Sequence, residues 1–311
     1  KPKKIISSLI LFSLIFGILE FIRGSILTGF PWNLIAYSFV NQLEIISIIS
    51  IIGTYGFNLF CISLFSCPAL LILGKSNKET FVFIFFIICL SVSYLHGFQY
   101  KKKFNASNEI KQNYKIRAIG SSISLERFYS SNNPVSIIKE LIKISNPSLS
   151  EKTIFIWPEG ILPNISQKEL IEYKWLFKNK FNKNHLLAIG INKQIVEGDS
   201  KKYYNTFSIY DHELNLINSY SKINLVPFGE YLPFENLFSK IGLKTITNNY
   251  QSYSKGNKRD IIQVKKDDFS IKILPLICYE IIYSGKLFDS PDFDLIVNIS
   301  EDGWFGQSIG P

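Results

Sequence analysis

Apolar residues fill three long runs in the first hundred positions of the chain. Residues 5–22 contain Glu20 as their only charged side chain, and residues 45–73 and 81–100 contain none. A bilayer core about 30 Å thick needs about 20 helical residues, so each run is long enough to cross it. Buried helices of a large soluble protein are the alternative. A cleaved signal peptide is a poor explanation, because none of the runs is followed by a small-residue cleavage site. Uncharged runs of this length favour three transmembrane spans.

Basic residues between the runs indicate an orientation. Three lysines precede the first run, and Lys75 and Lys78 separate the second from the third. Positively charged loops tend to stay in the cytoplasm, which places the chain after residue 100 outside it. The lysines at 101–103 oppose this locally, but long domains translocate largely regardless of charge.

From about residue 111 the pattern changes to short β-type runs that alternate with amphipathic helices. Two helices are predicted, one beginning at Asn133-Pro134 and running to about residue 144, the other capped by Ser166 and Glu169 and continuing to Phe181. Strands separated by helices predict a layered α/β domain. We therefore divide the chain into a membrane region, 1–103, and an α/β domain, 104–311. The predicted strands are 114–119, 153–157, 186–191, 203–210, 261–264, 270–277 and 294–299.

Composition narrows the possible partners. The chain has 311 residues, 47% of them apolar, and a net charge of +9. Residues 1–103 carry nine Lys and Arg against three Asp and Glu, and the remainder twenty-five against twenty-two, so the excess lies beside the apolar runs. This favours a membrane over a nucleic acid, because the polar half lacks a basic stripe with interleaved aromatics. The three histidines are scattered without metal-ligand spacing, so neither a metal nor a cofactor is expected.

One cysteine and one glutamate follow predicted strands. Cys278 comes after the apolar run 271–277, and the other three cysteines lie inside the membrane runs. Glu159 stands in the turn WPEG (157–160), directly after a strand. Strand ends are where α/β sites form. Taken singly, Cys278 is better explained as a buried inert thiol, and Glu159 as a solvated loop carboxylate.

A lysine completes a possible acyl-transfer site. Lys222 is flanked by apolar residues, and Glu230, nearby in the same segment, offers a second carboxylate. Acyl transfer needs a nucleophile, a base and a cation for the oxyanion, which Cys278, Glu159 and Lys222 could supply. The carboxylate can act on a thiol only if burial raises its pKa, and Lys222 would favour the thiolate.

These residues resemble the carbon-nitrogen hydrolase (nitrilase) superfamily, whose Glu, Lys and Cys occur in this order, and within it the apolipoprotein N-acyltransferases. The similarity runs from the first span to the last residue. The motifs that carry it are EFIRG (20–24), TGFPW (28–32), WPEG (157–160), LVPFGEYLP (225–233), ICYE (277–280) and WFGQSIGP (304–311).

The resemblance implies a multi-span α-helical membrane region followed by a nitrilase-like αββα sandwich. It implies a monomeric enzyme of the bacterial inner membrane with its catalytic domain in the periplasm. Cys278 would take an acyl group from a phospholipid of the phosphatidylethanolamine type and form a thioester. The N-terminal amine of a diacylglyceryl-cysteine lipoprotein would then accept it.

The resemblance also implies residue roles. Glu159 would be the general base and Lys222 the oxyanion partner. Glu230, Tyr279 and Glu280 would support the geometry or the substrate. Trp304 and Phe305 would lie near the acyl pocket, although ordinary packing also explains aromatics after a strand.

The sequence departs from the family at three points. Gly120-Ser121-Ser122 stands where a Gln-x-Asn sequence is expected, and Glu301 replaces the usual Asn. The chain begins with Lys and ends at Gly-Pro, so we expect a fragment truncated at both ends. Two alternatives share these residues: an amidase that releases the acyl group to water, and a membrane scaffold without catalysis.

Overall fold

The computed structural model describes residues 4–26, 29, 31–74, 76–107, 113–120, 123, 133–198, 200–234, 252–266, 268–283, 285 and 287–305. The chain forms two compact units, Lys1–Ile110 and Lys111–Pro311. The boundary between the membrane region and the α/β domain, placed at 103/104 from the sequence, stays a prediction.

The first unit is helical. Among its described residues, three helical segments are long and apolar enough to cross a membrane: Ile5–Arg23, Ile49–Leu73 and Asn77–Ala106. This confirms the three predicted apolar helices. The segments are built from α1 (Ile5–Arg23), α3 (Ile49–Ser66) with α4 (Pro68–Leu73), and α5 (Asn77–Ala106); η1 (Ile35–Phe39) and α2 (Leu43–Ile46) lie between the first two.

The bounds of the second and third segments differ from the prediction. Residues at 45–46 belong to the separate short helix α2, and Gly53 interrupts α3 with a φ of 72°. Only glycine adopts this left-handed conformation without a steric penalty. The third helix begins at Asn77 because Ser76 and Glu79 form a capping box.

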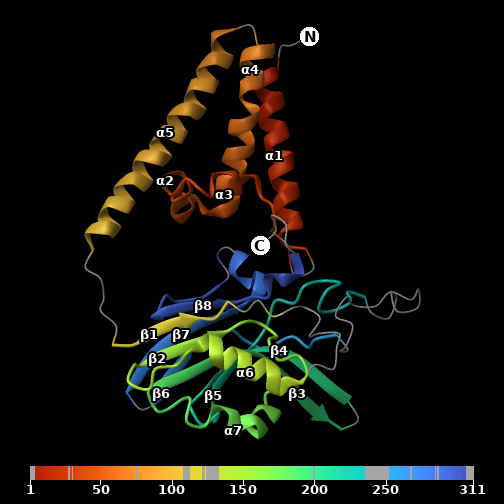
Figure 1. Cartoon of the computed structure of the whole chain (residues 1–311). Coiled ribbons are helices and arrows are strands. Elements are labelled where there is room, and N and C mark those ends of the chain that lie inside the picture. The colour runs from red at the N-terminus through yellow and green to blue at the C-terminus, as the bar shows by residue number, and fades with distance from the viewer. Residues whose placement is uncertain are drawn as a thin grey trace. The chain divides into compact units, whose positions relative to one another are not determined.

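Helix α5 packs closely against α2, and α1 packs along α3 (Figure 1). The close approach depends on Gly97, where an added Cβ would lie 1.9 Å from the Glu44 carbonyl oxygen. One helical turn further on, Lys101 Nζ lies 2.6 Å from Glu44 Oε1. A glycine contact and an ion pair thus join α5 to the short helix that precedes α3.

The second unit contains two sheets (Figure 1). In the first the strand order is β1-β2-β3-β4-β5, with β1, β2 and β3 parallel and the β3–β4 and β4–β5 pairs antiparallel. In the second the order is β6-β7-β8, with β7 antiparallel to β6 and parallel to β8. The strands are β1 (Lys115–Ala118), β2 (Thr153–Trp157), β3 (His185–Glu197), β4 (Ser200–Tyr210), β5 (Leu216–Ser221), β6 (Ile262–Lys266), β7 (Phe269–Ile277) and β8 (Leu295–Ile299).

Apolar side chains cover both faces of the central strands. In β2, Phe155 and Trp157 pack with Ile138 and Leu141 of helix α6 (Pro134–Ser145). The alternate residue Ile154 packs in the core that also contains residues of β6 and β7. Successive side chains of a strand point to opposite faces, so a strand between two cores must be apolar throughout. The result is a helix–sheet–sheet layering, as expected of the nitrilase-like α/β domain.

The predicted elements were found with one exception. All seven predicted strands are present, and α6 begins where Asn133 Oδ1 accepts the Val135 N–H at 3.0 Å. The prediction of one helix from Ser166 to Phe181 was wrong. The chain forms a 3-10 helix, η3 (Glu169–Tyr173), and a single turn, α7 (Lys174–Phe177), and Asn179 with a φ of 65° follows it. Such a left-handed residue ends a helix.

Strand β5 was not predicted. Its sequence, Leu-Ile-Asn-Ser-Tyr-Ser, lacks the apolar alternation of a half-buried strand, and only Tyr220 in it is buried. Within the described sheet β5 has β4 as its one neighbour. An edge strand buries less surface, so its apolar signal is weak. The strand matters because Lys222 follows it directly.

Candidate active site

Glu159 lies at the end of β2 in a tightly packed turn. Gly160 has a φ of 55°, and the Glu159 side chain is largely buried. Gly190 of β3 allows the turn to approach, since a Cβ there would lie 2.4 Å from the Pro158 carbonyl oxygen and 2.5 Å from Glu159 Cα. The neighbouring strand therefore fixes the position of the carboxylate.

Lys222 follows β5 and is almost completely buried, with an exposed fraction of 1%. Its Nζ lies 2.9 Å from Glu230 Oε1 and 3.7 Å from Glu159 Oε1. The structure thus brings together an ammonium and two carboxylates from three stretches of the chain. Because Nζ carries three N–H donors, it can contact both carboxylates and a further oxygen.

Asn205 of β4 links the two carboxylates. Its Nδ2 donates to Glu159 Oε1 at 2.7 Å and to Glu230 Oε1 at 3.1 Å. Glu230 Oε2 also accepts the Val226 backbone N–H at 2.9 Å. The acceptor atoms of both carboxylates are therefore held in place before any substrate binds.

Cys278 directly follows β7 and begins the 3-10 helix η5 (Cys278–Ile282) with a φ of 57°. A non-glycine residue in this region is strained, and such strain occurs at functional sites. The sulfur is half-buried and hydrogen-bonds to the Tyr279 backbone N–H. It lies within electrostatic reach of Glu159, Lys222 and Glu230. Lys222 Nζ lies 5.2 Å from the centre of the Tyr279 ring, so ammonium and thiol turn are neighbours.

The environment sets the resting protonation states. Burial raises the pKa of the Cys278 thiol to about 12; Glu159 adds to this and Lys222 opposes it. Burial also raises the pKa of Glu159, against the effect of Lys222. Burial disfavours the Lys222 ammonium, but Glu230 and Glu159 outweigh it and raise its pKa. At neutral pH the sulfur is a thiol, the lysine is charged, and a carboxylate of raised pKa stands beside them.

Not all predicted residues enter the site through their side chains. The Glu301 backbone N–H donates to Glu159 Oε2 at 3.2 Å, while its own carboxylate accepts the Gly303 N–H at 3.0 Å. The departure from Asn therefore falls on a side chain directed to its own turn. Trp304 and Phe305 lie in η6 (Asp302–Phe305), but their side chains fall outside the described residues, as do Ser121 and Ser122.

Glu280 is completely buried and caps η5 by accepting the Ile277 N–H at 3.0 Å. Arg259, which sequence analysis did not single out, pairs with it at 2.7 Å. Asn205 was also missed, although a signal existed. It shares a strand face with Phe207 and Ile209, which belong to the core between the sheets, so a polar residue there was out of pattern.

Two family models match the chain. One, described as the apolipoprotein N-acyltransferase N-terminal domain, matches residues 2–67, and the carbon-nitrogen hydrolase model matches residues 154–311. The second covers half of the chain and includes the stretches that carry Glu159, Lys222 and Cys278.

Curated relatives extend the similarity over nearly the whole chain. Apolipoprotein N-acyltransferases from Rhodopseudomonas palustris, Rickettsia prowazekii and Wigglesworthia glossinidia brevipalpis are 26%, 28% and 31% identical to it. The matches cover 94%, 97% and 94% of this chain and 56%, 59% and 56% of the relatives. The chain thus spans a little over half the length of these relatives.

A solved structure of a carbon-nitrogen hydrolase superfamily protein from Xanthomonas campestris is 15% identical, covers 60% of this chain and 64% of its own, and superposes with a TM-score of 0.37. At that score the superposition adds nothing to the sequence matches.

Proposed function

The chain belongs to the carbon-nitrogen hydrolase superfamily, in its apolipoprotein N-acyltransferase branch, and on that premise we propose that it transfers a fatty acyl group from a phospholipid to the N-terminal amine of a diacylglyceryl-cysteine lipoprotein. The observation that carries the proposal is the convergence of Glu159, Lys222 and Cys278. A phosphatidylethanolamine-type donor follows from the family resemblance.

In the first step the Cys278 sulfur attacks the ester carbonyl carbon of the phospholipid. Because the pKa of the thiol is about 12, the thiolate is scarce at neutral pH, and Glu159 must take the proton as the S–C bond forms. The Lys222 ammonium stabilises the oxyanion of the tetrahedral intermediate. The C–O bond then breaks, Glu159 returns the proton to the departing oxygen, and a lysophospholipid leaves the thioester behind.

In the second step the lipoprotein amine attacks the thioester carbonyl. Glu159 accepts the proton that the nitrogen loses, an amide bond forms, and the C–S bond breaks. The Cys278 thiolate leaves and takes up the proton from Glu159, which restores the resting site. A thiolate leaves more easily than an alkoxide, so the thioester suits transfer to an amine.

The helical unit supports a lipid substrate. It contains three helices long enough to cross a bilayer, and both proposed substrates are anchored in one. Following the family resemblance, we place the chain in the bacterial inner membrane as a monomer. The basic residues between the spans put the α/β domain in the periplasm. In spheroplasts of a Lys258→Cys variant, a membrane-impermeant maleimide should label the exposed position 258. Labelling only after lysis would reverse the orientation.

The test of the reaction uses full-length protein in detergent with phosphatidylethanolamine. Intact mass should show one added acyl group that hydroxylamine removes. The adduct should be absent from Cys278→Ser and retained by the matched control Cys89→Ser, which alters a cysteine of α5.

Adding a diacylated lipopeptide should then yield a triacylated peptide. Free fatty acid without triacylated peptide would replace the proposal with the hydrolase. If the wild type forms neither product and Cys278→Ser leaves the function of the protein in the cell intact, the scaffold is favoured.

A further inference from the structure

Glu280 joins the turn that carries Cys278 to the loop that carries Lys222. It lies two residues after Cys278, and its Oε2 accepts the Ile277 N–H at 3.0 Å. Its Oε1 accepts the first two backbone N–H groups after Lys222, at 3.2 and 3.1 Å. One carboxylate therefore holds both the backbone that carries the sulfur and the backbone that carries the ammonium.

Arg259 supplies the counter-charge for this carboxylate. The ion pair is closed at 2.7 Å, and the side chains of Arg259 and Glu280 are 4% and 0% exposed. Arg259 also donates to Asn224 Oδ1 at 3.2 Å and to the Tyr220 hydroxyl at 3.3 Å, and that hydroxyl donates to Glu280 at 2.8 Å. A buried carboxylate without a partner is strongly unfavourable, and the planar guanidinium can satisfy several acceptors at once.

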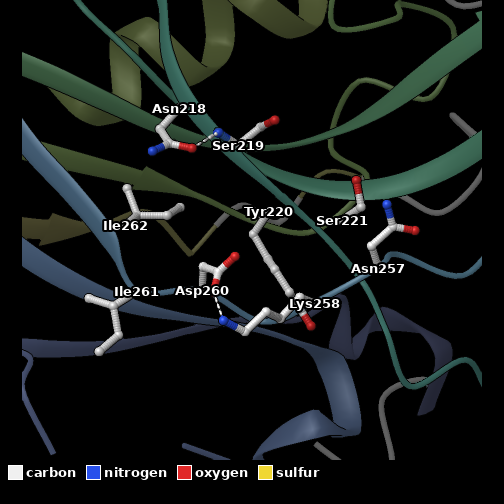
Figure 2. A pocket seen from close by; sticks show the side chains of 9 residues that line it. All are labelled: Asn218, Ser219, Tyr220, Ser221, Asn257, Lys258, Asp260, Ile261 and Ile262. Atoms are coloured by element: carbon white, nitrogen blue, oxygen red, sulfur yellow. Dashed lines mark hydrogen bonds and ion pairs between the residues drawn. The ribbon is translucent and has the colours of Figure 1, made fainter. Parts of the chain in front are cut away.

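Among the three consecutive charged residues 258–260, Arg259 is the one whose side chain is buried in the domain. Its neighbours Lys258 and Asp260 line a polar groove of about 380 Å³ beside β5 and form an exposed ion pair at 2.7 Å (Figure 2). Exposed pairs of this kind contribute little to stability. Of three consecutive charged residues, the middle one alone enters the interior, where it meets the carboxylate that ties the two halves of the site.

We propose that Arg259 is a positioning residue of the active site, which acts through Glu280 to hold the Lys222 ammonium against the Cys278 turn. Its described partners are Glu280, Asn224, Tyr220 and the Leu287 carbonyl oxygen. Its removal is expected to lower the rate of Cys278 acylation and leave phospholipid binding unchanged.

The physical reason is the double duty of Glu280. Without Arg259 the buried carboxylate either gains a proton or turns toward another donor, and in both cases its hydrogen bonds to the Lys222 loop weaken. Lys222 keeps its contacts with Glu230, but its backbone loses a fixed point relative to Cys278. A displacement of about 1 Å in a catalytic group can lower a rate by about 10²-fold.

The test compares Arg259→Gln with Lys266→Gln in the full-length protein. Lys266 pairs at 2.6 Å with Asp211, a carboxylate that is 2% exposed, so the control also removes the cation of a buried carboxylate. Arg259→Gln should lower kcat for acyl-enzyme formation by about 10²-fold without changing KM. Lys266→Gln should change neither, and Arg259→Lys should recover part of the loss.

A second readout follows the sulfur directly. Iodoacetamide alkylation of Cys278, measured by mass spectrometry of its peptide, rises with pH as the thiolate forms. The groups that act on this thiol are Glu159 and Glu230, which raise its pKa, and Lys222 and the Tyr279 N–H, which lower it. If Lys222 moves away, the pKa of the thiol rises, so at a given pH below that pKa Cys278 of Arg259→Gln must be alkylated more slowly than in the wild type, which is a shift of the profile to higher pH. A variant with only reduced stability would show no shift.

The inference rests on the proposed function, but alkylation requires no acyl donor and distinguishes the two failures. A wild type that never forms an acyl-enzyme overturns the reaction, whereas the alkylation comparison still decides the role of Arg259. Unchanged kcat and alkylation profile in Arg259→Gln, or changes equal to those of Lys266→Gln, would overturn the inference. If Arg259→Gln does not fold, Tyr220→Phe should give a smaller shift in the same direction, and its absence would be equally decisive.

Discussion

Two clusters of opposite charges are buried among the described residues of the α/β domain, and they differ in how fully the charges are matched. In the first, Lys222 faces two carboxylates, Glu159 and Glu230. In the second, the ion pair described for Arg259 is with Glu280, which also accepts backbone and hydroxyl donors. The carboxylates of the first cluster retain exposed fractions of 9% and 8%, and Glu280 has none.

This difference in charge matching distinguishes the cluster that can exchange a proton from the cluster that holds the backbone in position. Two carboxylates that share one ammonium are incompletely compensated, and burial raises the pKa of Glu159, which equips it to exchange a proton. Glu280 is saturated with donors and has no such role. Burial and the adjacent Glu280 likewise raise the pKa of Tyr220, which keeps its hydroxyl a donor. Identical residue types therefore serve different ends according to their hydrogen-bond partners.

Removing the base from the first cluster should have the largest effect. Glu159→Gln keeps the shape of the side chain but cannot accept the thiol proton, so acyl-enzyme formation should fall by about 10²–10⁴-fold. Single-turnover mass spectrometry would measure the rate. Glu301→Gln is the matched control, because this carboxylate contacts Gly303 within its own turn and should be dispensable. Equal losses in the two variants would remove Glu159 from its assigned role.

Removing the shared cation should have a somewhat smaller kinetic effect. Lys222→Met leaves two buried carboxylates without their counter-charge and takes away the oxyanion partner. The acylation rate should fall by about 10²–10³-fold, and stability by about 3–5 kcal/mol. Thermal unfolding and single-turnover kinetics would separate these effects. Lys258→Met, which alters an exposed lysine, should match the wild type. Wild-type kinetics in Lys222→Met would equate this cluster with a purely structural ion pair.

The structures of the two regions of the chain could be predicted from the sequence to different extents. The apolar helices follow from composition alone, since a run without charges of this length has few alternatives. Continuous apolar strands such as β2 were also predictable, because both of their faces are buried. The polar edge strand β5 was not, and neither was the break in α3 at Gly53, whose φ of 72° the surrounding apolar pattern does not reveal.

Within the site, the local pattern predicted the residues directly after strongly apolar strands, and the family resemblance supplied Lys222, Glu230 and Glu280. Arg259 and Asn205 were missed. Glu159 and Cys278 follow β2 and β7, so local pattern placed them at strand ends. Arg259 stands between Lys258 and Asp260 in a segment that reads as solvent-exposed, and nothing local distinguishes it from its neighbours. Its partner Glu280 is near in space because β6, which follows Arg259, pairs antiparallel with β7, which precedes Glu280.

Weakening the link between the two carboxylates should give the smallest of these effects. Asn205 lowers the pKa of Glu159 by donating to its carboxylate, so in Asn205→Ala that pKa should rise further. The base acts when deprotonated, and the rate is lost as pH falls through its pKa; the acidic limb of the acylation profile must therefore move to higher pH. A hydrogen bond to a charged group contributes about 1.5–3 kcal/mol, which corresponds to a loss of about 10–10²-fold on that limb and none above it. Asn192→Ala serves as the control, since Asn192 lies opposite Asn205 in β3 but accepts the Tyr253 hydroxyl at 3.0 Å, and its limb should not move. If Asn205→Ala lowers the rate equally at every pH, Asn205 acts on the fold of β4 and not on the proton of Glu159.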